Sequence, residues 1–136
     1  MKSTSAFSAA FPLDILVAEH QPDVSAETKE ILYDLGYTPR TATTSMDVIR
    51  MTNDHQYDVI LMDIRMPGLE AILTAPRSRE DVRPIIIAVS GTASPDFEEA
   101  CLQDRMDHCL TRPIGEDELL LQLKACSILA GKCIIR

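Results

Sequence analysis

The stretch YDVILMDIRMP, Tyr57 to Pro67, contains an unbroken apolar run that ends in a single acid, Asp63. Runs of this kind are typical of strands that are covered on both faces, as in parallel sheets. DILVAE (Asp14 to Glu19) and RPIIIAVS (Arg83 to Ser90) have the same character. Amphipathic segments separate these runs, and such alternation predicts a parallel sheet with helices on both faces.

The remaining elements follow from the periodicity of apolar residues and from helix-breaking residues. The segment Tyr37 to Thr43 is strand-like but contains Pro39, which has no N–H to donate, so an edge strand is expected. A brief strand is expected at His108 to Leu110. Helices are expected over Ser25–Leu35 (capped by Asp23 or Ser25 and stopped by Gly36), from Ser45 onward, over Leu69–Ala75, from Pro95 to about Asp104, and over Glu116–Ala130.

Polar side chains follow several of the expected strands. In open parallel sheets, ligands bind beyond the carboxyl ends of the strands. Glu19 and His20 follow the first strand, Asp63 and Ser90 end two others, and Thr111 with Arg112 follow the last. The sequence therefore predicts that acids, a hydroxyl and a cation converge at one edge of the sheet.

Composition limits the kinds of function that are plausible. The chain has 136 residues and a net charge of -8, which fits one domain and argues against binding to a phosphate backbone. We expect a flexible leader over residues 1–12 that docks partly through Phe11, a domain over residues 13–130, and a tail over 131–136. No apolar run approaches the ~20 residues of a membrane span, so a cytoplasmic protein without membrane insertion is expected.

The four cysteines are spaced without a metal-binding motif, so we expect them to be reduced thiols. They are Cys101, Cys109, Cys126 and Cys133.

Four segments together resemble the successive motifs of response-regulator receiver domains of two-component signalling. They are ILVAEHQP (15–22), YDVILMDIRMP (57–67), IIIAVSG (85–91) and LTRPIGEDELL (110–120). The resemblance implies a flavodoxin-like, doubly wound (βα)5 three-layer sandwich with a parallel sheet of order 2-1-3-4-5. It also implies a phosphorelay protein that is not itself an enzyme and that signals by contact with a downstream protein, without binding nucleic acid.

The resemblance further implies roles for individual residues. Asp63 would accept a phosphoryl group from a histidine kinase or a histidine phosphotransfer protein, and Ser90 and Arg112 would contact that group. A Mg²⁺ ion would be held by Glu19, Asp63 and the backbone carbonyl of Arg65. Mg²⁺ would offset the charge repulsion between the nucleophile and the phosphoryl oxygens.

Several positions depart from the family pattern, among them Glu19, which is one methylene longer than the usual Asp. His20 stands where receivers place a second acid, and imidazole is a poor Mg²⁺ ligand, so Mg²⁺ binding should be weakened or lost. His20 would then solvate the edge of the site, bind a softer divalent ion with Glu19 and Asp63, or supply a positive charge. Arg112 replaces the usual Lys and would either contact a phosphoryl group or hold Asp63 inactive in a static salt bridge. Cys109 stands where many receivers have an aromatic switch residue.

Two alternatives to a phosphorylated receiver follow from these residues. The first is a pseudo-receiver, which has the same fold and acts as a fixed protein-interaction module. The second is a hydrolase that uses Asp63 as a transient nucleophile, but phosphatases of the haloacid dehalogenase type need a second Asp where Arg65 stands. No glycine-rich phosphate loop follows any expected strand, which argues against nucleotide binding.

Overall fold

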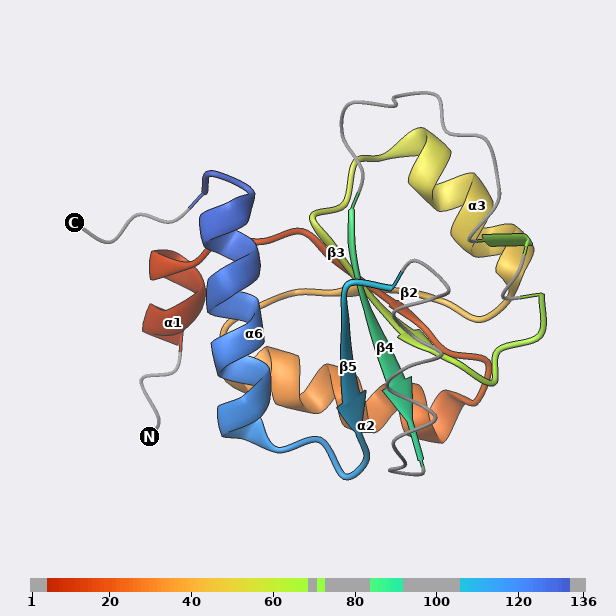
Figure 1. Ribbon diagram of the computed structural model, residues 1–136, viewed down its shortest axis with the longest axis horizontal. Coiled ribbons are helices and arrows are strands. Elements are labelled where there is room, and N and C mark those ends of the chain that lie inside the picture. The colour runs from red at the N-terminus through yellow and green to blue at the C-terminus, as the bar shows by residue number, and fades with distance from the viewer. Residues whose placement is uncertain (1–4, 69–70, 73–83, 92–105, 133–136) are drawn as a thin grey trace.

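A five-stranded, all-parallel sheet forms the centre of the protein (Figure 1). The computed structural model describes residues 5–68, 71–72, 84–91 and 106–132. The strands are β1 (Ile15–Ala18), β2 (Arg40–Ala42), β3 (Val59–Asp63), β4 (Ile85–Ser90) and β5 (His108–Thr111), and their order in the sheet is β2-β1-β3-β4-β5. The doubly wound fold and the strand order are therefore confirmed, including the edge position of β2, which begins directly after Pro39.

Helices cover both faces of the sheet because alternate strand residues point in opposite directions. In β3, Val59 and Leu61 contribute to one core cluster, together with residues of α2 (Pro22–Asp34) and α6 (Glu116–Leu129). Ile60 and Met62 contribute to a second cluster with residues of α3 (Ser45–Asp54). Figure 1 shows α2 and α6 on one side of the sheet and α3 on the other.

The start of α2 differs from the expectation. The helix begins at Pro22, ahead of the expected start near Ser25, and its N-cap is Gln21, which makes no side-chain cap hydrogen bond. Neither Asp23 nor Ser25 acts as the cap, because Pro22 has a fixed φ suited to the first helical turn and sets the start. The expected stop is confirmed, since Gly36 follows the helix with φ of 96°, a conformation that favours glycine.

The structure describes the N-terminal segment from residue 5 onward. Residues 5–10 form helix α1 (Ser5–Ala10), and the backbone N–H of Ser8 donates to the carbonyl of Leu35 at 3.2 Å. The Phe11 side chain is buried, and its carbonyl accepts a hydrogen bond from the Tyr37 hydroxyl at 2.6 Å. Burial of the apolar Phe11 side chain contributes to holding this segment against the domain.

Some expected elements lie outside the described residues. They are the helix from Pro95 to Asp104 and all but residues 71–72 of the helix over Leu69–Ala75. Within the described part of the chain, no helix is long and apolar enough to cross a membrane.

The N-cap of α3 yields a stability prediction. The Thr44 hydroxyl accepts the backbone N–H of Asp47 at 3.1 Å, which satisfies one of the free donors at the helix start. Thr44→Ala should lower the free energy of unfolding by about 1 kcal/mol, measured by urea denaturation followed by circular dichroism. Thr44→Ser keeps the hydroxyl and should stay close to the wild type; equal midpoints for all three proteins would contradict the capping role.

Candidate functional site

Asp63 is the last residue of β3, the central strand of the sheet. Its side chain is 4% exposed, and Oδ1 accepts the backbone N–H of Arg65 at 2.9 Å. This hydrogen bond fixes the carboxylate at the carboxyl edge of the sheet. The second oxygen, Oδ2, is the one nearer to the guanidinium of Arg112.

Glu19 follows β1 and lies next to Asp63. The backbone N–H of Glu19 donates to the carbonyl of Ala42 at 3.0 Å, which extends the pairing with the edge strand. Its side chain is 3% exposed, and Oε2 accepts the backbone N–H of Gln21 at 2.9 Å. Two carboxylates that are nearly excluded from water therefore share one small region.

Arg112 supplies the positive charge at this edge. It follows β5, and its backbone N–H donates to the carbonyl of Ser90 at 2.7 Å, which continues the pairing of β5 with β4. Its Nη2 atom lies 2.7 Å from Glu19 Oε1 and 3.6 Å from Asp63 Oδ2. Within the described part of the chain its buried Nε–H has no acceptor, so one donor of the guanidinium is unsatisfied.

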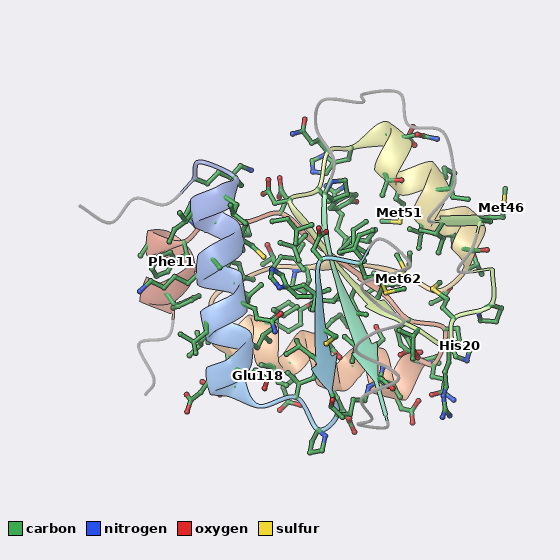
Figure 2. The ribbon with its side chains drawn as sticks, in the orientation of Figure 1. Phe11, His20, Met46, Met51, Met62 and Glu118 are labelled. Atoms are coloured by element: carbon green, nitrogen blue, oxygen red, sulfur yellow. The ribbon has the colours of Figure 1, made fainter. Side chains whose placement is uncertain are left out.

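His20 lies at the outer edge of the same group. Its Nδ1 atom is 3.2 Å from Glu19 Oε2, and 36% of its side chain is exposed. One ligand atom from each of Glu19, His20 and Asp63 lies within 4.8 Å of the other two. Figure 2 shows the labelled His20 side chain at the periphery, on the opposite side of the molecule from the labelled Phe11.

The surroundings of the Glu19 carboxyl act on its pKa in opposite directions. Desolvation raises the pKa of Glu19 above its ordinary value, and the adjacent Asp63 carboxyl raises it further. The Gln21 backbone N–H and the Arg112 guanidinium lower the pKa, but less than burial and Asp63 raise it. Arg112 thus offsets only part of the electrostatic cost of placing two acids side by side.

The structure brings together most of the residues singled out in the sequence. Glu19, His20, Asp63 and Arg112 form one contacting group, and the buried Ser90 is paired with Thr111 across β4 and β5 at the same edge. The Arg65 side chain points to solvent, and its backbone N–H is the group that contacts Asp63. The short Arg112–Glu19 pair was not anticipated, since Asp63 was the expected partner, and no sequence signal distinguishes the two acids.

The doubly wound parallel sheet places the buried acids and the cation at the carboxyl edge, where open α/β sheets bind their ligands. The family model of the response regulator receiver domain matches residues 15–124. The chain belongs to this family.

Curated relatives include histidine kinases. The chain is 28% identical over 104 residues to the sensor histidine kinase RcsC of Escherichia coli, covering 76% of the chain and 11% of RcsC. It is 33% identical over 129 residues to histidine protein kinase 1 of Candida albicans, covering 85% of the chain and 5% of that kinase. The chain therefore spans only a small part of these relatives.

Solved receiver domains have the same fold. The receiver domain of sensor histidine kinase PA1611 from Pseudomonas aeruginosa is 28% identical, with a TM-score of 0.71 over 85% of the chain and 97% of that domain. That crystal structure contains a magnesium ion coordinated in the active-site cleft. The Francisella response regulator 1452 receiver domain has a TM-score of 0.74 at 23% identity over 87% of the chain and 98% of that domain.

The donors of this chain do not match the preference of Mg²⁺. Mg²⁺ prefers oxygen ligands in near-octahedral geometry. Here one of the three clustered donors is an imidazole nitrogen, and one oxygen of Glu19 is already held by Arg112. The described residues therefore offer a mixed nitrogen and oxygen set, which is a poor fit to Mg²⁺.

The raised pKa of Glu19 predicts a pH-dependent cost to stability. The folded state favours the protonated carboxyl, so the cost is present above the folded pKa and absent below the ordinary value of 4.5. As the pH falls from neutral toward 4.5, the wild type should therefore gain stability relative to Glu19→Gln, as measured by urea unfolding at each pH. Glu30→Gln, which removes an exposed acid of α2, controls for net charge, and a difference that grows in the opposite direction would contradict the assignment.

Proposed function

We propose that this domain is a phosphorelay receiver in which Asp63 accepts a phosphoryl group from a phosphohistidine donor. The observation that carries the proposal is the position of the Asp63 carboxylate. It is buried at the end of β3, and the Arg112 guanidinium lies 3.6 Å from Oδ2. Ser90, one residue beyond the partner of Asp63 on β4, lies at the same edge.

The chemistry requires a carboxylate nucleophile and compensation for negative charge. An oxygen of Asp63 attacks phosphorus, the bond from phosphorus to the donor imidazole breaks, and the imidazole leaves with the electron pair and takes up a proton. Negative charge then accumulates beside two acids. Arg112 is the guanidinium that offsets it, and Ser90 is the hydroxyl that donates to a phosphoryl oxygen.

An unsatisfied donor supports an anion-binding role for Arg112. A buried N–H without an acceptor costs about 1–3 kcal/mol. The Nε–H of Arg112 is buried and has no acceptor among the described residues. A phosphoryl oxygen would satisfy this donor and would bring a second charge-assisted hydrogen bond to the guanidinium.

The partners follow from the relatives and from the charge of the chain. The curated relatives are histidine kinases, so a kinase or a phosphotransfer domain is the proposed donor. With a net charge of -8, the domain is proposed to signal through a downstream protein and not through nucleic acid. Residues 13–130 form the proposed receiver unit, followed by a tail over 131–136. We propose a cytoplasmic location and no enzymatic turnover of its own.

A second candidate function is favoured by the Arg112–Glu19 contact. At 2.7 Å this ion pair is shorter than the distance from Arg112 to Asp63. A guanidinium committed to Glu19 would leave the site in one fixed arrangement, as in a pseudo-receiver that binds a partner without phosphorylation. The two candidates differ in whether Arg112 assists or blocks the reaction at Asp63.

Intact mass after incubation with acetyl phosphate tests the acceptor role. The wild type should gain one phosphoryl group in the presence of Mg²⁺ or Mn²⁺, whereas Asp63→Asn, which lacks the nucleophilic carboxylate, should gain none. Circular dichroism of both proteins controls for folding. Labelling of Asp63→Asn would place the acceptor elsewhere, and an unlabelled wild type would favour the pseudo-receiver.

Arg112 variants separate the two candidate functions. If Arg112 stabilises the phosphoryl group, Arg112→Ala should lower the rate of incorporation by roughly 10- to 100-fold, the equivalent of one charge-assisted hydrogen bond. Arg112→Lys retains the charge and should keep most of the rate. A faster Arg112→Ala would show that the native Arg112 restrains Asp63, as the pseudo-receiver alternative requires.

A further inference from the structure

The most unusual chemical feature of the site is the imidazole beside the two buried carboxylates. We infer that His20 makes this site selective for a transition-metal ion of the zinc and cobalt class over Mg²⁺, with Glu19 and Asp63 as the oxygen ligands. This inference refines the proposed function by naming the cation that would occupy the same site.

The distances among the donors suit a small divalent ion. Bonds from zinc to imidazole nitrogen and carboxylate oxygen are about 2.0–2.2 Å, so neighbouring ligands of a tetrahedral ion are about 3.3–3.6 Å apart. His20 Nδ1 and Glu19 Oε2 are separated by 3.2 Å, which is close to a neighbouring-ligand distance. All three donor atoms lie within 4.8 Å of one another, so binding would draw the donors together by at most about 1.5 Å.

The two oxygens of Glu19 face different partners. Oε1 is held by Arg112 at 2.7 Å, whereas Oε2 faces His20. Oε2 also accepts the Gln21 N–H at 2.9 Å, and a carboxylate oxygen has a second lone pair for a metal. Arg112 and a metal ion can therefore share the Glu19 carboxylate without competing for one atom.

Charge balance explains why Mg²⁺ is disfavoured. Mg²⁺ is held mainly by electrostatic attraction to anionic oxygens. Glu19 and Asp63 supply two negative charges, and Arg112 already offsets one of them, so the site retains a net charge close to -1. A neutral imidazole adds no charge, but it forms strong bonds to zinc, cobalt and nickel ions. Histidine in place of an acid at position 20 therefore weakens Mg²⁺ binding and favours binding of a transition-metal ion.

A second histidine provides a matched control. His55 Nε2 lies 3.5 Å from Asp14 Oδ2, and the His55 side chain is 40% exposed, close to the exposure of His20. It lies just before β3, at the opposite end of that strand from Asp63. Among the described residues, the cluster of three potential metal ligands contains His20 and not His55.

The test is a calorimetric titration of untagged protein with Mg²⁺ and with Co²⁺, at mildly alkaline pH and without a phosphodonor. The wild type should bind Co²⁺ at least ~100-fold more tightly than Mg²⁺. His20→Ala should lose roughly 10- to 100-fold in Co²⁺ affinity, and His55→Ala should match the wild type. His20→Asp should bind Mg²⁺ roughly 10-fold more tightly than the wild type, because it restores an oxygen ligand.

Visible absorption of the cobalt complex identifies the donor atoms. Coordination by nitrogen and oxygen gives weak d–d bands, whereas thiolate ligands would add an intense near-ultraviolet band and would place the ion at a cysteine. Equal Co²⁺ affinity in the wild type and His20→Ala, or a thiolate band, would overturn the inference. Since no phosphodonor is present, that failure would leave the role of Asp63 to be decided by the separate mass measurement.

Discussion

The ion pair between Arg112 and Glu19 is the contact on which the arrangement of the site depends. Glu19 and Asp63 are almost fully buried, and two adjacent carboxylates in a region of low dielectric repel each other strongly. The guanidinium, 2.7 Å from Glu19 and 3.6 Å from Asp63, is the counter-charge that lies between them. Removing one partner of such a pair leaves an uncompensated buried charge, which destabilises a fold more than the intact pair stabilises it.

Ion pairs also hold the connections on both sides of α6. Arg112 lies in the connection that leads into α6 and contacts Asp63 at the carboxyl end of β3. Beyond the other end of the helix, Lys132 Nζ lies 2.7 Å from Oδ2 of Asp58, just before β3 begins. The connections on both sides of α6 are thus tied to the two ends of one central strand. Phe11, which has the Lys124 ammonium 5.6 Å from its ring centre, adds a contact along the helix.

Much of the fold was predictable because it depends on local and repetitive signals. The apolar runs at Asp14–Glu19 and Tyr57–Asp63 identify buried strands, and Pro39 indicates the edge strand without any tertiary information. Strand ends in a parallel sheet meet at one edge, so the convergence of Glu19, Asp63 and Ser90 also follows from pattern. Cys109, which stands where many receivers have an aromatic residue, is half-buried on β5.

Other features were not predictable, for identifiable physical reasons. Helix α1 is six residues long and has no acid in its first turn and no base in its last, so it lacks the usual signals. Its order comes from tertiary contacts such as the Tyr37 hydrogen bond to Phe11, across 26 residues. The choice of Glu19 over Asp63 as the nearer partner of Arg112 involves a separation of 93 residues and depends on side-chain reach, which a sequence pattern does not contain.

The departures from the family pattern compensate one another in physical terms. Glu19 is one methylene longer than aspartate, and arginine presents two terminal nitrogens in a planar fork, so the two side chains can meet while the guanidinium stays near Asp63. Once arginine offsets one carboxylate, a third acid at position 20 is less necessary for charge balance, and a neutral imidazole is tolerated there. Histidine in place of an acid at position 20 removes an anionic oxygen that would attract Mg²⁺. It supplies a nitrogen ligand with a directional lone pair instead. In the proposed metal site, position 20 governs the choice of cation, while Arg112 governs how much charge that cation must offset.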